Sequence, residues 1–241
     1  MIEVHTVATM NGMKVAVMLE EAGLAYTAKR YNPLAGDHLT PEFHKLNPNH
    51  KLPVIVDRDP VDGGPPLTVF ETGAILMYLA EKTGRFMPTD FRRREVARQW
   101  LIWQVAGLGP MHGQANHFLR YAPAGNDYAV ARYSKEAVRL MNVLESRLKE
   151  HEYLADEYSI ADIACWSFAS VCHAIGIDIG DFPATADWSA RIAARPAVAR
   201  VLANRRAVTP QSALKARMNL NEAEWNNVFG DRMLNAAKGV E

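Results

Sequence analysis

Cysteine is scarce in this 241-residue chain, and no apolar run reaches the roughly 18 to 20 residues that span a membrane. The two cysteines, Cys165 and Cys172, exclude a disulfide scaffold and a Cys-x-x-Cys redox pair. They stand two helical turns apart in an apolar stretch, so we expect them to be buried and unbridged.

Neither sign of charge is in excess, since 27 Lys and Arg balance 27 Asp and Glu. This balance argues against a nucleic-acid or membrane-surface binder, which would show a basic excess. The start, MIEVHTVATM, carries an early acid and no long apolar segment, so it does not resemble a signal peptide. We therefore expect a cytoplasmic protein, and the length allows two domains.

The first 80 residues alternate between strand and helix patterns. Helical spacing of apolar residues follows the first strand and the last one. The strands are expected at 2–6, 26–31, 52–57 and 67–70. The order β-α-β, then a connection, then β-β-α predicts a thioredoxin-like domain.

Strand patterns stop near residue 90 and long helical patterns follow. Ser159 to Asp162 has the form of a capping box, and the apolar helix after it is expected at the centre of a bundle. The predicted fold class is α/β plus all-α. The expected parts are a thioredoxin-like domain at 1–83, an all-helical domain at 90–206 and a C-terminal helical extension at 207–241.

Two possible helix starts lie in that extension, at Thr209-Pro210 and at Asn221 to Glu224. Trp225 and Phe229 follow the second and could pack back on the helical domain. We interpret the extension as a helical cover; the alternative is a mobile lid.

The strand-to-helix turn ATMNGMKV, residues 8–15, is the first candidate site. Thr9, Asn11 and the opening N-H groups of the helix could donate hydrogen bonds to a sulfur that a ligand brings. A helix N-terminus favours a thiolate over a thiol, so such a site needs no cysteine of its own.

Two further turns could hold a peptide ligand. Leu52-Pro53 is expected to be cis, with Leu52 offering its N-H and C=O to a short peptide; the alternative is a trans proline at a strand edge. Glu71 and Thr72 stand where a strand meets a helix and could hold an amino-acid end, or serve only as an N-cap.

The segment 103–118 contains Gly107, Gly109 and Pro110, which we expect to kink a helix. Polar residues after the kink, His112 among them, could line a second-substrate pocket or a dimer interface. The spacing of His112 and His117 makes metal binding improbable.

Five segments together resemble the nu-class glutathione transferases, a bacterial group related to the yeast nitrogen regulator and prion protein. They are VATMNGMKV, NPNHKLPVIVD, FETGAILMYLAEKTG, WQVAGLGPMHGQANHF and YSIADIACW. The resemblance covers the chain to about residue 200. It implies a two-domain homodimer that reduces a small disulfide with glutathione as co-substrate, without a metal, and with weak peroxidase and transferase activity.

The resemblance also implies a set of ligand-binding residues. Thr9 and Asn11 would face the glutathione sulfur, and His38 stands where the group usually has Gln. Thr72 replaces the commoner Ser. The full set is Thr9, Asn11, His38, Leu52, Pro53, Glu71, Thr72 and Arg132.

Two other functions stay open. Conjugation of glutathione to an electrophile would use the same ligand site. A regulatory protein would keep glutathione binding without turnover, as in the yeast relative. That relative has a long low-complexity N-terminal arm, whereas a strand is expected here from residue 2, so we favour an enzyme.

Overall fold

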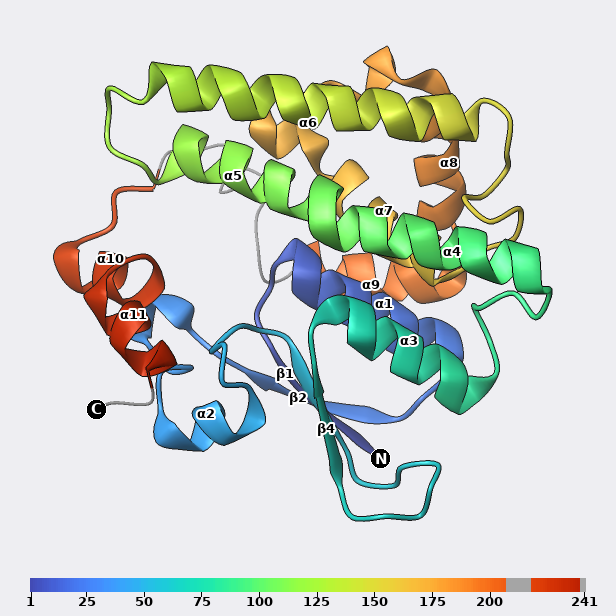
Figure 1. Ribbon diagram of the computed structural model, residues 1–241, viewed down its shortest axis with the longest axis horizontal. Helices are drawn as coiled ribbons and strands as arrows, with labels where there is room; N and C mark the ends of the chain where they lie inside the picture. Colours follow the sequence, from blue (N-terminus) through green and yellow to red (C-terminus); the bar gives the residue numbers. More distant parts are fainter. Residues whose placement is uncertain (207–217, 239–241) are drawn as a thin grey trace. The chain divides into compact units, whose positions relative to one another are not determined.

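The computed structural model describes residues 1–206 and 218–238 (Figure 1). The contacts divide the chain into two units. The first comprises Met1–Lys82 together with Asn219–Glu241, and the second is Thr83–Met218.

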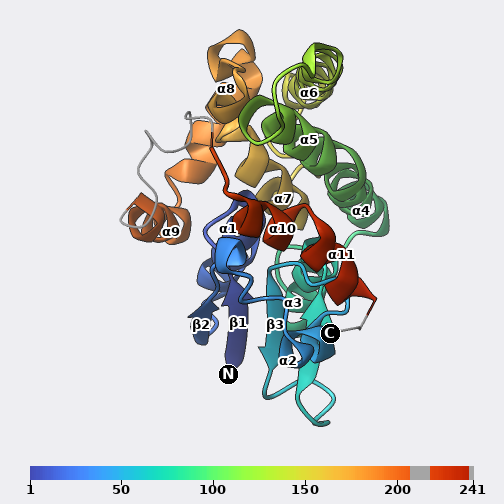
Figure 2. The same cartoon turned by 90° about the vertical axis from the view of Figure 1, so that its left-hand side faces the viewer.

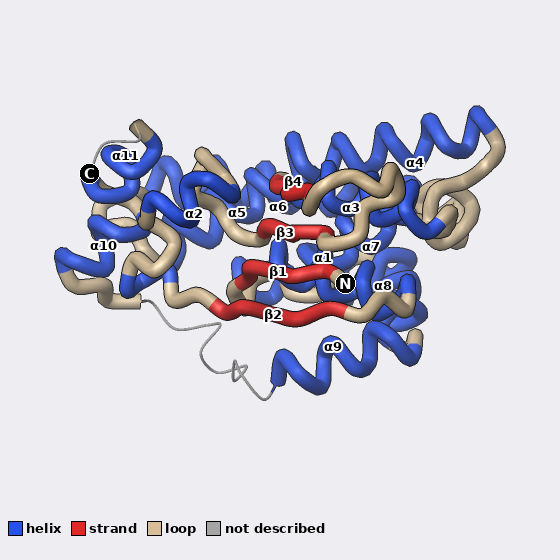
Figure 3. Tube along the Cα trace, turned by 90° about the horizontal axis from the view of Figure 1, so that it is seen from below, coloured by secondary structure: helices blue, strands red, loops and turns tan. Residues whose placement is uncertain are grey.

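A four-stranded mixed sheet organises the first unit, in the order β2-β1-β3-β4 (Figure 3). The strands are β1 (Ile2–Thr6), β2 (Tyr26–Arg30), β3 (Val54–Asp57) and β4 (Leu67–Phe70). β1 pairs parallel with β2, and the other pairs are antiparallel. This arrangement confirms the predicted thioredoxin-like plan.

The first unit also contains helices. They are α1 (Met10–Ala22), η1 (Pro33–Ala35), α2 (Pro41–Leu46), α3 (Thr72–Thr83), α10 (Glu222–Val228) and α11 (Asp231–Ala237). Two of them, α1 and α3, have buried apolar faces. α1 and α3 lie over the same face of the sheet (Figures 1 and 3). Leu19 of α1 and Leu79 of α3 are fully buried, as is Ile55 of β3. The buried face of the strands, where every second residue is apolar, packs against the apolar faces of these helices. The first unit therefore has its own core.

The second unit contains only helices in its described residues, 83–206 and 218. They are α4 (Phe91–Trp103), the π-helical turn η2 (Gln104–Leu108), α5 (Gly109–Arg120), α6 (Asp127–Leu148), α7 (Ile160–Ala169), η3 (Cys172–Ile175), η4 (Ile179–Asp181), α8 (Pro183–Ala193) and α9 (Pro196–Arg206). No helix in the described part of the chain is both long and apolar enough to cross a membrane.

Every residue of α7 is buried, which confirms its predicted place in the bundle core. The predicted capping box is present: Ser159 N-H donates to Asp162 Oδ2 at 3.0 Å. The same carboxylate accepts from Leu154 N-H and from Trp188 Nε1, each at 3.0 Å. Cys165 and Cys172 are buried and unbridged, as expected.

A π-helical turn separates α4 from α5 next to the residues expected to kink the helix, Gly107, Gly109 and Pro110, and turns of this kind often accompany a kink. The backbone stays helical, and Gly109 N-H donates to Gln104 C=O across a π-helical turn. Pro110 is accommodated because it stands in the first turn of α5, where no intrahelical N-H partner is required. His112 is buried, with its ring edge-on to Phe168.

The C-terminal extension differs from expectation in where it packs. The helix start at Asn221 to Glu224 is confirmed by a second capping box. Thr209-Pro210 lies outside the described residues. α10 and α11 group with the first unit instead of the helical one.

Candidate functional site

The first predicted turn is an N-cap. Thr9 precedes α1, its Oγ1 accepts from Gly12 N-H at 3.4 Å, and its C=O accepts from Met13 N-H at 2.9 Å. Because the hydroxyl oxygen is the acceptor, its hydrogen remains able to donate outward. Asn11, half-buried in the first turn of α1, adds an amide donor.

Gly12 makes this turn compact. A Cβ at this position would lie 2.3 Å from Val7 O and 2.6 Å from Thr6 Oγ1. Only glycine therefore allows the opening of α1 to approach the end of β1 this closely. The Asn-Gly pair in the sequence is the signal of this approach.

Strand register brings the three predicted turns to one end of the sheet. His5 near the end of β1 pairs with Val54 at the start of β3, and Val54 pairs with Phe70 at the end of β4. Three turns therefore meet at the same end of the sheet. They are the turn after β1, the Leu52-Pro53 bond before β3 and the Glu71-Thr72 turn after β4.

The Leu52-Pro53 bond is cis, as expected. Leu52 is half-buried, and its backbone N-H and C=O have no hydrogen-bond partner in the described chain. A peptide pairing with both groups would satisfy them as an added strand does.

Glu71 adopts a left-handed backbone conformation, with φ of 67°, and its side chain is exposed. Its C=O accepts from Ile75 N-H at 2.9 Å, so α3 starts immediately after it. Thr72 Oγ1 accepts from Lys14 Nζ at 3.1 Å. The turn thus presents a carboxylate, a hydroxyl and the first N-H groups of a helix.

Lys14 is the residue that the predicted site set lacks. It is 2% exposed and reaches from α1 to the first residue of α3. Its burial could have been noticed from the sequence, because Lys14 stands in α1 between Met13 and Val15, which are both buried. A lysine on the buried face of a helix needs a polar partner, and Thr72 supplies one.

His38 and Arg132 are placed differently from the other predicted residues. His38 is 4% exposed and stands edge-on to Phe43. Burial, then the charges of Lys51 and His50, lowers the pKa of His38 to about 4, so its imidazole is neutral. Arg132 belongs to α6 in the second unit, where its Nη1 lies 3.6 Å from Glu136 Oε2.

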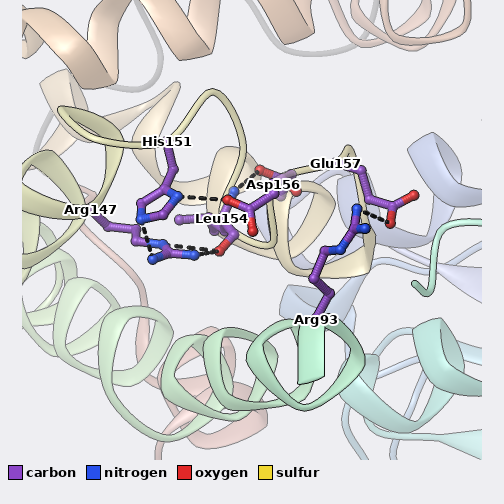
Figure 4. Close-up of polar contacts among 7 residues, drawn as sticks. Arg93, Arg147, His151, Leu154, Asp156 and Glu157 are labelled. Atoms are coloured by element: carbon purple, nitrogen blue, oxygen red, sulfur yellow. Dashed lines mark hydrogen bonds and ion pairs between the residues drawn. The ribbon is translucent and has the colours of Figure 1, made fainter. Parts of the chain in front are cut away.

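A second polar cluster lies in the second unit, in the loop after α6 (Figure 4). His151 Nδ1 is 2.6 Å from Asp156 Oδ1, and its Nε2 faces Arg147. Arg147 also donates to Leu154 C=O at 2.8 Å. Because both ring nitrogens are engaged, this cluster closes the loop and offers no group for acid-base chemistry.

No cluster of three or more His, Cys, Asp and Glu side chains that could bind a metal occurs in residues 1–206 and 218–238. Burial raises the pKa of the Cys172 thiol to about 11. A thiol of this kind is protonated and inert at neutral pH.

Comparisons with known proteins agree with this geometry. The glutathione S-transferase N-terminal domain family matches residues 2–81, and the glutathione S-transferase C-terminal domain family matches residues 110–196. The chain is 47% identical over 203 residues to the disulfide-bond oxidoreductase YfcG of Escherichia coli, covering 84% of this chain and 94% of that protein. It is 37% identical over 213 residues to YghU of the same organism, covering 83% and 73%.

Solved structures give the same result. A glutathione transferase from Burkholderia graminis, with two glutathione molecules bound per subunit, has a TM-score of 0.78 at 44% identity and covers 83% of this chain and 87% of that one. One from Pseudomonas putida, with one glutathione disulfide bound per subunit, has a TM-score of 0.78 at 38% identity, covering 83% and 90%.

Proposed function

The chain belongs to the glutathione S-transferase family, and on this premise we propose that it reduces disulfide bonds with glutathione as co-substrate. The observation that carries the proposal is that three turns meet at one end of the sheet. They offer thiolate donors at Thr9 and Asn11, unpaired backbone at Leu52 and a charged turn at Glu71 and Thr72. The similarity to two disulfide-bond oxidoreductases supports the reaction type.

The proposed placement of glutathione follows from the groups that each turn presents. The cysteinyl backbone pairs with Leu52, next to Pro53. The γ-glutamyl carboxylate accepts from Thr72 and the first N-H groups of α3, and the γ-glutamyl ammonium pairs with Glu71. Its sulfur then faces Thr9 and Asn11. Arg132 is proposed to supply a cation, and His38 a neutral imidazole contact.

The reaction balances without a protein cysteine. The thiolate of the bound glutathione attacks one sulfur of a small disulfide, forming a mixed disulfide and releasing the other sulfur as a thiolate, which takes up a proton. A second glutathione thiolate attacks the glutathione sulfur of the mixed disulfide. The products are glutathione disulfide and two thiols, so two glutathione molecules are oxidised for each disulfide reduced.

The protein lowers the barrier by keeping the sulfur anionic. Each pKa unit by which the glutathione thiol falls from about 8.5 represents about 1.4 kcal/mol of thiolate stabilisation. Thr9, Asn11 and the N-H groups at the start of α1 provide it. A homodimer located in the cytoplasm is also part of the proposal.

The experiment measures turnover of hydroxyethyl disulfide, and of a chloronitrobenzene as the competing electrophile, both with glutathione. Thr9→Ala and Asn11→Ala should each lower kcat for the disulfide by about tenfold or more, with a smaller change in KM. Thr9→Ser keeps the hydroxyl and is the matched control. Unchanged kcat in both alanine variants would remove these residues from the mechanism.

Turnover of neither substrate by a protein that still binds glutathione would reject the enzyme in favour of a regulatory function. Faster turnover of the electrophile than of the disulfide would reject reduction in favour of conjugation.

A further inference from the structure

Within the first unit, a buried amide side chain joins the C-terminal helices to η1. Asn227 is 5% exposed, and its Nδ2 donates to Leu34 C=O in η1 at 2.7 Å. Its Oδ1 accepts from Arg232 Nη1 at 2.8 Å. A single side chain therefore joins η1 to the guanidinium and fixes where Arg232 lies. Figures 1 and 2 show α10 beside the segment that follows β2.

The guanidinium of Arg232 lies against the backbone of Gly36, in the turn after η1. A Cβ at Gly36 would lie 2.7 Å from Arg232 Nη1 and 3.0 Å from Asn227 Oδ1. Gly36 also has φ of 80°, which other residues rarely adopt. The guanidinium thus packs against backbone two residues before His38, which is in the predicted ligand set.

The charges around His38 are mainly positive. After burial, Lys51, His50 and Arg232 each contribute to the lowered pKa of His38, and Asp37 opposes them. Asp37 Oδ2 already accepts from Asn32 N-H at 2.9 Å. Nδ1 of His38 is buried without a partner in the described chain. Lys51 immediately precedes Leu52, so this positive region adjoins the groups that would pair with the cysteinyl residue.

We propose that Arg232, presented by α11 and held by Asn227, is a specificity-determining residue that binds the glycyl carboxylate of glutathione together with Lys51. This inference rests on the proposed function. The two ends of an extended tripeptide lie on opposite sides of its middle residue, so the glycyl end points away from Glu71 and Thr72. The C-terminal helices supply the cation at that end, and a guanidinium matches a carboxylate in shape and charge.

The test compares glutathione with its glycyl monoethyl ester, which lacks the charge, on the full-length protein by titration calorimetry under reducing conditions. Arg232→Gln should weaken binding of glutathione about tenfold, as expected for a lost charge-assisted hydrogen bond, and change binding of the ester less than about twofold. Lys238→Gln removes an exposed cation at the end of the same helix and should change neither. Asn227→Ala, which releases the guanidinium, should reproduce part of the selective loss.

The outcomes separate the two proposals. If the wild-type protein binds glutathione and Arg232→Gln weakens both ligands equally, or weakens neither, the role of Arg232 is rejected while the proposed function stands. If the wild-type protein binds neither ligand, both proposals fail. Thermal unfolding of each variant confirms that it is folded before its affinity is compared.

Discussion

Glu71 offers a sharp test because its backbone and its side chain predict opposite effects. Its φ of 67° is unfavourable for any residue with a Cβ, at a cost of about 1–2 kcal/mol. Its exposed carboxylate is proposed to bind the ammonium of glutathione. Replacing Glu71 with glycine should therefore stabilise the fold and weaken the ligand.

The magnitude follows from comparing glycine with alanine at this position. Both variants lose the carboxylate, and only glycine relieves the left-handed conformation. Glycine loses about 0.5–1 kcal/mol more conformational entropy on folding, which offsets part of the gain. Glu71→Gly should therefore exceed Glu71→Ala by about 0.5–1 kcal/mol in free energy of unfolding, a rise of about 1–4 °C in Tm. Both variants should bind glutathione about tenfold more weakly.

Gly23 provides the matched control. It has φ of 69°, and nothing lies within 4 Å of a Cβ built there. Gly23→Ala should lose a similar free energy and leave glutathione binding unchanged. The assays are denaturant unfolding and titration calorimetry. Equal stability of the two Glu71 variants would refute the backbone reasoning, and undiminished affinity would remove Glu71 from the ligand site.

Three other predictions test separate parts of the structure. Lys14→Met should weaken glutathione binding about tenfold, because it removes a buried cation beside Thr72; calorimetry showing unchanged affinity would contradict this. Burial lowers the pKa of His112 to about 4, so the unfolded protein binds more protons below pH 6.5, and stability is lost as the pH falls towards 4. Because His38 has a similarly lowered pKa, the wild-type protein should lose about 1.4 kcal/mol more than His112→Gln when urea unfolding at pH 5.5 is compared with pH 8; equal losses in the two proteins would refute this. Asp162→Ala should cost about 3 kcal/mol or more in unfolding free energy, because it removes the acceptor of four donors, whereas exposed Asp187→Ala should cost less than about 0.5 kcal/mol. Similar losses in the two variants would count against the capping network.

Local features of the chain were predictable because neighbouring residues cause them. The alternating apolar pattern predicted the four strands, the capping box at Ser159 predicted one helix start, and Asn221 to Glu224 indicated another. Gly107, Gly109 and Pro110 indicated an irregular place in a long helix, but not its form: a π-helical turn separates α4 from α5, with Pro110 in the first turn of α5.

The amino-acid sequence by itself determined the elements, the order of the two units and the small polar residues of the three turns. Only the tertiary structure decided which of these groups meet, because the pairing of β1 with β3 joins residues 49 to 55 positions apart, and β3 then pairs with β4. The same holds for Lys14 on Thr72 and for Arg232 over Gly36, where a charge far away in the chain packs against a turn. Such contacts depend on strand register and helix packing, which no local pattern encodes.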